Sequence, residues 1–209
     1  MFVAMLFVFA LLPFFGGVQA IAHTPVNATL LLAISSVIGI AVGDTLYFWS
    51  MTKIGAARAL PISGTYPLFT WALAVPILGE KITLNAMLGT VLVLVGVYFL
   101  APQTETTIHS DARMERWGMV GALVAAALWA IATMMLKIGI DQAPHVIVVN
   151  AIRLPVAALA SALITHRQRG FAAWRGYNRK SLPMLIALSI YSTGIGMIIW
   201  TLTVDFAGA

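Results

Sequence analysis

Runs of about twenty apolar residues follow one another along almost the whole chain, and this pattern most constrains its fold. A helix needs roughly 20 mainly apolar residues to cross the hydrocarbon core of a bilayer. Charged residues make up only 9% of the chain and hydrophobic residues 61%, whereas a soluble domain carries roughly 25% charged residues. We therefore predict an all-α, polytopic membrane protein surrounded by the lipid bilayer. The expected spans lie at about residues 1–20, 28–50, 59–79, 82–101, 117–138, 144–165 and 182–204.

The first of these runs has an alternative interpretation. It ends in Val18, Gln19 and Ala20, which resemble the small-residue cleavage site of a secretory signal. However, the basic segment that begins such a signal is missing, and the first Lys or Arg of the chain is Lys53. We therefore expect a membrane span here.

The basic residues predict the orientation of the chain. Loops that hold more Lys and Arg stay in the cytoplasm, and the loops after the second, fourth and sixth spans are the basic ones. The opposite side carries only Lys81 and Lys137. This distribution explains the net charge of +5 without a nucleic-acid partner. The basic loops hold Lys53, Arg58, Arg113, Arg116, Arg167, Arg169, Arg175, Arg179 and Lys180.

One stretch of the chain matches another without gaps at an offset of 153 residues. Residues 39–56 read GIAVGDTLYFWSMTKIGA, and residues 194–209 read GIGMIIWTLTVDFAGA. In this register Gly43 meets Gly196, and Tyr47 meets Trp200. A duplicated helix unit in a membrane protein indicates two halves that face each other across a substrate path.

Residues 79–83 (GEKIT), Gly89 and residues 94–97 (LVGV) resemble the EamA family of the drug/metabolite transporter superfamily. The resemblance implies ten helices in two inverted five-helix repeats, of which the seven expected spans match the second to the eighth. The pair of repeats is therefore incomplete, and we expect a fragment or a truncated gene model. Both family termini are usually cytoplasmic, which opposes the orientation from the charge bias; we follow the bias. The implied division is 1–101 for the first repeat, truncated at its start, 102–116 for a polar linker, and 117–209 for the second, truncated at its end.

Asp44 is the sharpest candidate for function, because an ionisable group inside a span costs about 2.5–3.5 kcal/mol and needs a partner or a wet cavity. Tyr47 and Met51 follow it by three and seven residues and share its helix face. We interpret Asp44 as a carboxylate that binds a proton or a substrate amine. The alternative is an acid near the membrane edge, hydrogen-bonded to a neighbouring helix.

Arg153, with Asn150 one turn earlier, lies well inside the sixth span. It has two interpretations, binding of an anionic substrate group or fixing of helix packing through Asp44 or backbone carbonyls, and we favour packing.

Lys137 ends the fifth span, where a lysine that extends to the interface is expected. A contact with a substrate carboxylate is the alternative.

Four aromatic residues complete the candidate site. Tyr47 and Trp200 occupy matching repeat positions, and Tyr66 and Trp129 lie on other spans. Aromatic rings with a polar group line substrate pockets, and they also populate the interfacial belts of membrane proteins.

Three further features predict packing. Pro67 lies inside the third expected span and should kink it. Gly89 and Gly96 should share a face for close helix contact. Glu80 should stabilise the start of the following helix.

The sequence therefore predicts secondary transport of a small molecule, with protons as a possible coupling ion and the plasma membrane of a bacterium or archaeon as its location. We expect no catalytic residues, metal or cofactor. A homodimer is a further expected partner. One alternative is a non-transporting fragment that merely folds or binds another membrane subunit. A remote one is an intramembrane aspartyl protease that uses Asp44 and Asp205.

Overall fold

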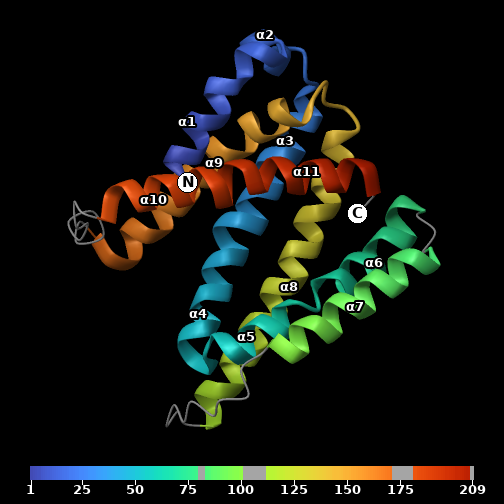
Figure 1. The fold of residues 1–209 in the computed structure, drawn as a ribbon, viewed down its shortest axis with the longest axis vertical. Coiled ribbons are helices and arrows are strands. Elements are labelled where there is room, and N and C mark those ends of the chain that lie inside the picture. The colour runs from blue at the N-terminus through green and yellow to red at the C-terminus, as the bar shows by residue number, and fades with distance from the viewer. Residues whose placement is uncertain (80–82, 101–111, 171–180, 208–209) are drawn as a thin grey trace. The chain divides into compact units, whose positions relative to one another are not determined.

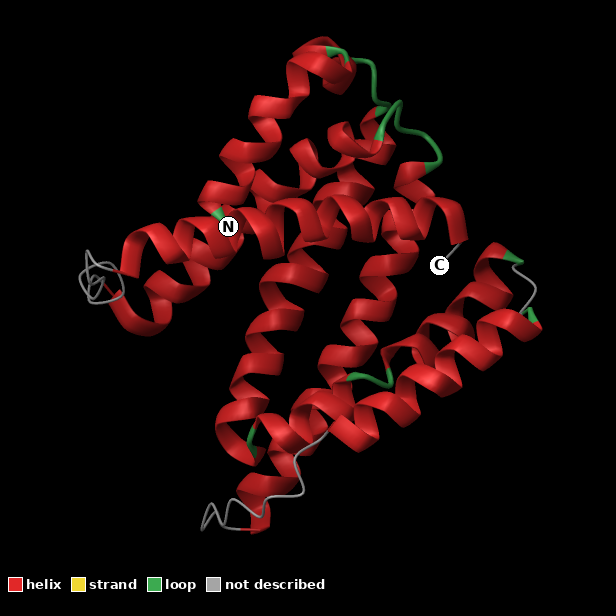
Figure 2. Cartoon of the chain, in the orientation of Figure 1, coloured by secondary structure: helices red, strands yellow, loops and turns green. Residues whose placement is uncertain are grey.

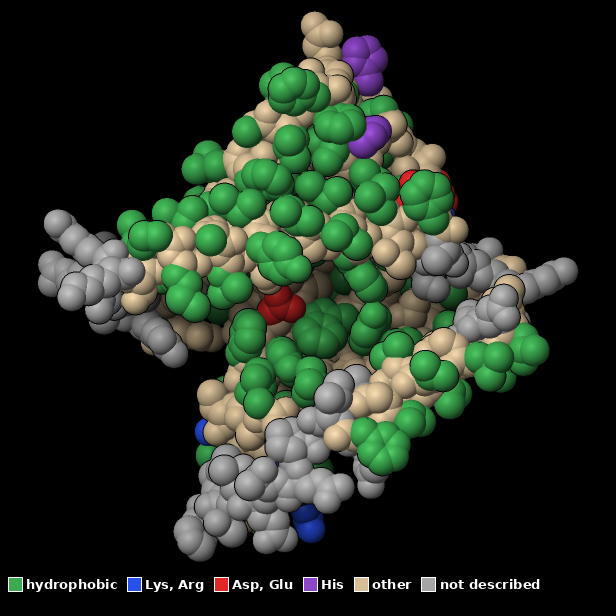
Figure 3. Space-filling model, viewed as in Figure 1, with side chains coloured by type: hydrophobic (Ala, Val, Ile, Leu, Met, Phe, Trp, Pro, Cys, Tyr) green, Lys and Arg blue, Asp and Glu red, His purple; other side chains and the backbone are tan. Residues whose placement is uncertain are grey.

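The computed structural model describes residues 1–79, 83–100, 112–170 and 181–207, and every regular element in these ranges is a helix (Figures 1 and 2). Within them, four helices are long and apolar enough to cross a membrane, and the face in view in Figure 3 is largely hydrophobic. The all-α prediction is confirmed, and the chain is an integral membrane protein. The four helices are Val26–Ile54, Ala112–Ile140, Val146–Gln168 and Leu182–Phe206.

The helices follow one another with short breaks. In chain order they are α1 (Phe2–Leu11), η1 (Leu12–Phe15), α2 (Gly17–Ala22), α3 (Val26–Ser36), η2 (Val37–Gly43), α4 (Asp44–Ile54), α5 (Ala56–Ser63), α6 (Tyr66–Leu78), α7 (Leu84–Leu100), α8 (Ala112–Ile140), α9 (Val146–Arg169), α10 (Leu182–Leu188), η5 (Ser189–Ile195) and α11 (Gly196–Ala207).

Contacts divide the chain into two compact units. Unit 1 comprises residues 1–37 and 135–208, and unit 2 comprises residues 38–134 with residue 209. In unit 1, α9 is the central helix and contacts α1, α3 and α11, while α1 also contacts η5. The core of unit 1 is a cluster of aliphatic side chains that includes Val8, Leu32, Leu136, Val148 and Val204.

In unit 2, α8 packs closely along η2 and α4 because glycines remove the side chains from the contact. A Cβ atom added to Gly118 would lie 2.6 Å from Cγ2 of Ile54, and one added to Gly121 would lie 2.6 Å from Oγ of Ser50. From the other helix, a Cβ atom on Gly39 would lie 2.7 Å from Cβ of Ala132. Small residues that let two backbones approach are the usual basis of helix association in membranes.

The close helix contact therefore does not involve Gly89 and Gly96, the two glycines for which the sequence predicted it. Cβ atoms added to Gly89 and Gly96 would meet nothing within 4 Å among the described residues. The spacing of seven places both on one face of α7, but spacing alone does not say whether another helix lies against that face.

Two long helices each contain a seven-residue π-helical segment, η2 and η5. A shift of η2 by the 153-residue offset of the sequence match gives residues 190–196, one position from η5. Helix bounds vary by one or two residues with the criterion, so the two segments occupy equivalent places. This coincidence supports an internal repeat, and the division into repeats stays a prediction.

The first and third expected spans are both broken. The first helix ends at Phe15, because Gly16 and Gly17 adopt the left-handed φ values of +93° and +64°. The third is divided into α5 and α6, and Pro67 is in the first turn of α6. A proline there costs no hydrogen bond, since the first amides of a helix have no partner within it. The predicted kink at Pro67 is therefore wrong.

The predicted linker, residues 102–116, ends in a helix, and its role between the repeats stays a prediction. Residues 112–116 form the start of α8, not a loop. Residues 102–111 of the linker and Glu80 lie outside the described residues.

Candidate functional site

Asp44 and Trp129 form the centre of a polar site in unit 2. The indole Nε1–H of Trp129 donates to Oδ1 of Asp44 at 3.0 Å and also to the carbonyl oxygen of Gly39 at 3.2 Å. One donor thus ties α8 both to the carboxylate and to the backbone of η2. The neighbouring-helix hydrogen bond considered for Asp44 is present, and Trp129 supplies it.

Two tyrosines surround this hydrogen bond. The ring centroid of Tyr47, from α4, lies 5.2 Å from that of Trp129 with an interplanar angle of 57°. The ring of Tyr66, from α6, lies 6.2 Å away at 89°, an edge-to-face arrangement. The Tyr47 side chain also interacts with the buried Ser63 of α5. The site draws on four helices, and sequence reasoning did not identify Ser63.

Gly43 allows Trp129 to approach the site. A Cβ atom at Gly43 would lie 2.9 Å from both Cδ1 and Nε1 of Trp129, which is shorter than a van der Waals contact. Gly43 also ends η2, so Asp44 begins the regular helix α4. The missing side chain of Gly43 therefore leaves room for the indole of Trp129 next to the carboxylate of Asp44.

Asn150, from α9, forms a second polar contact in unit 1. Its Nδ2 donates to Oγ1 of Thr201 at 3.0 Å and to the carbonyl oxygen of Val146 at 2.9 Å. Both Asn150 and Thr201 are essentially fully buried. The contact joins α9 to α11, so Asn150 has a structural role, and Thr201 is a partner that the sequence did not indicate.

Arg153 is buried in unit 1, with 3% of the residue exposed. Its Nε and Nη1 atoms have no hydrogen-bond partner among the described residues. Arg153 and Asp44 belong to different units, so their pairing stays a prediction.

Lys137 contacts protein groups at the end of α8. Its Nζ lies 3.2 Å from Oδ1 of Asp141 and 3.2 Å from the carbonyl oxygen of Asp205. The ammonium therefore holds the end of α8 to the end of α11. The sequence proposed interface extension or a substrate contact, and it missed this role because Asp205 is 68 residues away.

Trp200 lies in unit 1, where it packs against the aliphatic core. The structure thus gathers Asp44, Tyr47, Tyr66 and Trp129 in unit 2, and it places Asn150, Arg153 and Trp200 in unit 1.

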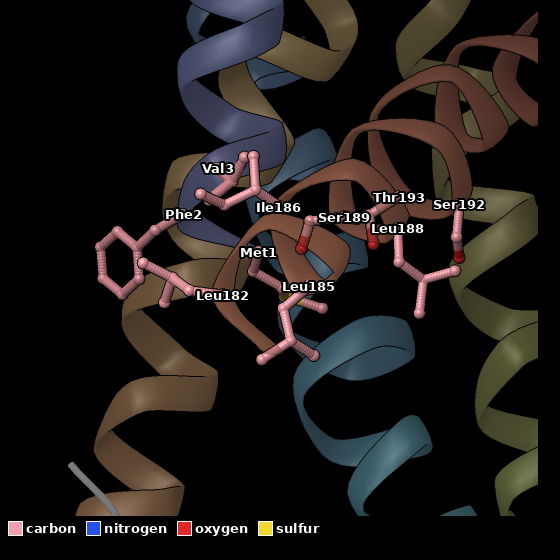
Figure 4. Close-up of a pocket in the computed structure, with 10 residues that line it drawn as sticks. All are labelled: Met1, Phe2, Val3, Leu182, Leu185, Ile186, Leu188, Ser189, Ser192 and Thr193. Carbon is pink, nitrogen blue, oxygen red and sulfur yellow. The ribbon is translucent and has the colours of Figure 1, made fainter. Parts of the chain in front are cut away.

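A cleft of about 420 Å³ opens in unit 1 between the start of α1 and the α10–η5 segment (Figure 4). Its lining is mostly apolar, with the hydroxyl groups of Ser189, Ser192 and Thr193 from η5 as the polar part. The candidate residues from the sequence do not line it.

In the described part of the chain, no group of three or more His, Cys, Asp or Glu side chains is placed to hold a metal ion. The chemistry available at the Asp44 site is therefore that of one carboxylate, one indole donor and two phenol groups.

Residues 1–101 match the EamA-like transporter family. Over 171 residues, 81% of this chain, the sequence is 29% identical to an uncharacterized transporter of Archaeoglobus fulgidus. Residues 1–101, somewhat less than half of the chain, are thus similar to the EamA-like transporter family. The family resemblance of the sequence is thereby confirmed.

A second relative of this EamA-like chain is an uncharacterized protein of Methanocaldococcus jannaschii, 33% identical over 72 residues, or 34% of this chain. The matches span 59% of the length of the first relative and 53% of the second. The chain thus spans less than two thirds of the curated relatives that it matches. No solved structure matches it.

Proposed function

We propose that this EamA-like chain belongs to a secondary-active transporter that moves a small organic molecule by alternating access, with the Asp44 site in the substrate path. The family match and the similarity to a protein named as a transporter support this function. The observation that carries the role of the site is the convergence of Asp44, Tyr47, Tyr66 and Trp129. Ionisable groups inside spans mark substrate and ion pathways by default.

The proposed mechanism gives the Asp44 carboxylate two alternate occupants. In one state it holds a proton, and in the other it holds the substrate, so that the two move in opposite directions. Trp129 keeps the carboxylate in place through its N–H group. The two repeats would then expose the site to either side of the plasma membrane in turn.

The test is flux through the full chain reconstituted in liposomes, measured as solute-dependent proton movement with an interior pH dye. Metabolite pools, including amines and amino acids, are screened first. Asp44→Asn should abolish the flux or uncouple it from protons while the protein still inserts. The matched control is Asp141→Asn, because Asp141 is exposed in a loop. Unchanged coupled flux in Asp44→Asn would remove Asp44 from the mechanism.

A second candidate function is a membrane subunit that requires a partner. The supporting observation is the low burial of the apolar helix Leu182–Phe206. Only 6% of its most apolar stretch is buried against the rest of the chain, so this surface is free to contact a partner. Co-expression of a second chain, which carries the part of the relatives that this sequence does not match, tests this alternative. Flux that appears only with the partner would support it, and flux by the chain alone would exclude it.

A further inference from the structure

Among the described residues of unit 2, no Lys or Arg forms an ion pair with the Asp44 carboxylate. Its hydrogen-bond partner there is the neutral indole of Trp129. Of the described basic residues of unit 2, Lys53 lies over the ring of Trp49, and Arg58 pairs with Glu115. The other two, Arg113 and Arg116, lie at the start of α8. A carboxylate inside a membrane span is costly unless a positive charge or several donors stabilise it. The site is thus electrostatically complementary to a cation that the described residues of this unit do not provide.

The groups around the carboxylate favour an organic cation. Aromatic rings from α4, α6 and α8 meet at Trp129, with centroid distances of 5.2 Å to Tyr47 and 6.2 Å to Tyr66. The face of an aromatic ring attracts an ammonium group within about 6 Å, and tryptophan is the strongest such ring. A carboxylate beside several aromatic rings supplies both charge and an apolar, polarisable surface.

A bare metal ion fits these groups poorly. Hard cations take six or more oxygen ligands, and no cluster of three or more acidic or histidine ligands exists among the described residues. An anion would meet the negative charge of Asp44 directly. The combination therefore selects for a positively charged group that carries its own hydrocarbon.

We propose that the Asp44 cluster (Asp44, Tyr47, Tyr66 and Trp129) binds the ammonium group of an organic cation. This inference rests on the proposed function, because it names the substrate class of the same site. Asp44 supplies the charge, and the three rings contact the carbon atoms around the nitrogen.

The experiment is calorimetric titration of the purified full chain in detergent with three probes: tetramethylammonium, choline and phenyltrimethylammonium. The matched neutral probe is 3,3-dimethyl-1-butanol, which has the shape of choline with carbon in place of nitrogen. At least one of the three ammonium probes should bind. If choline binds, it should bind about tenfold or more tightly than the alcohol, a difference of about 1.4 kcal/mol. Absence of binding by all three ammonium probes would overturn the proposal.

Variants separate the charge from the rings. Trp129→Leu should weaken ammonium binding about tenfold, because it removes the strongest cation–π ring of the cluster. Asp44→Asn should weaken it about tenfold or more, because it removes the opposite charge. Tyr66→Leu removes one ring of the cluster and should also bind the ammonium probes more weakly. Tyr191→Leu is the control, because Tyr191 is exposed and lies in unit 1. Each variant is first checked for an unchanged helical circular dichroism spectrum and monodisperse elution.

Two results would count against the ammonium site while leaving transport intact. Equal binding of choline and its neutral analogue would indicate an apolar pocket, and tighter binding of benzenesulfonate would indicate an anion site. If Asp44→Asn abolishes flux of a non-cationic solute, the proposed function holds and the ammonium inference fails. If ammonium probes bind but never cross the liposome membrane, the inference holds and the proposed transport fails.

Discussion

Trp129 uses a single N–H group for two acceptors, the carboxylate of Asp44 and the carbonyl of Gly39. Trp129→Phe keeps a ring and removes the donor, so it should leave a partly buried carboxylate without its hydrogen bond. We expect a loss of stability of about 1.5–3 kcal/mol, the usual range for a hydrogen bond to a charged group. Thermal unfolding in detergent measures it, with the exposed Trp117→Phe as the control. Equal unfolding of both variants would contradict the importance of this donor.

Removal of the buried Arg153 side chain should raise the stability of the protein, in contrast to the loss expected for Trp129→Phe. Its Nε and Nη1 atoms have no partner among the described residues. A buried charged group whose donors are not satisfied keeps its desolvation cost, so an apolar side chain of similar volume should be more stable there. Arg153→Met should therefore raise the unfolding temperature, whereas Arg116→Met, at an exposed position, should leave it unchanged. A lower unfolding temperature for Arg153→Met would indicate that the guanidinium has an essential partner.

At the scale of helices, the contact between α8 and the η2–α4 segment depends on the absence of side chains. Gly43→Ala places a methyl group 2.9 Å from two atoms of Trp129, and such overpacking typically costs about 1–3 kcal/mol. Gly89→Ala on α7 meets nothing within 4 Å of described residues, and it should gain stability because alanine favours helix by about 1 kcal/mol. Chemical unfolding of the two variants should therefore give changes of opposite sign.

The hydrogen bond between Asn150 and Thr201 should couple α9 to α11. A double-mutant cycle with Asn150→Leu and Thr201→Val isolates the pair, since each change removes one partner. Interhelical hydrogen bonds in membranes average about 0.6 kcal/mol, so we expect a coupling energy of about 0.5–1.5 kcal/mol. A coupling energy of zero would show that the buried pair does not hold these helices together.

For the whole molecule, the orientation in the membrane can be tested directly, because the chain contains no cysteine. Arg167→Cys lies at the end of α9 and Gln142→Cys in the loop before it, and both positions are exposed. The charge bias predicts that a membrane-impermeant maleimide labels the first from the cytoplasmic side and the second from the outside. The reverse pattern would show that the family's usual orientation applies.

Apolar run lengths predicted most of the helices, because crossing a bilayer requires about 20 such residues whatever their neighbours are. The start of α9 is an example, expected at residue 144 and found at Val146. The breaks were harder to predict. Gly16-Gly17 adopts left-handed φ values that glycine permits but does not require, and Pro67 begins a helix where an interior kink was expected.

The sequence identified the individual residues of the site, but it did not predict that they lie together. Asp44, Tyr47, Tyr66 and Trp129 were each identified from type and position, yet Asp44 and Trp129 are 85 residues apart. Their contact depends on how α8 lies against α4, and that packing is set by glycines whose neighbours a single sequence does not reveal. Ser63 and Thr201 gave no signal, since serine and threonine commonly satisfy their own helix backbone.

The π-helical segments have a consequence for insertions and deletions. A π turn holds one residue more than an α turn, so the loss of any one residue from Val37–Gly43 would allow a regular helix to form. Each residue advances a regular α-helix by about 100°, so a deletion elsewhere in such a helix turns every later side chain by that angle. In Val37–Gly43 the wider turns already accommodate the extra residue, and its loss would leave the later side chains of α4 on nearly the same face. The carboxylate of Asp44 would stay beside the indole of Trp129. This segment is therefore the place in the helix where a relative can be one residue shorter and still keep the site.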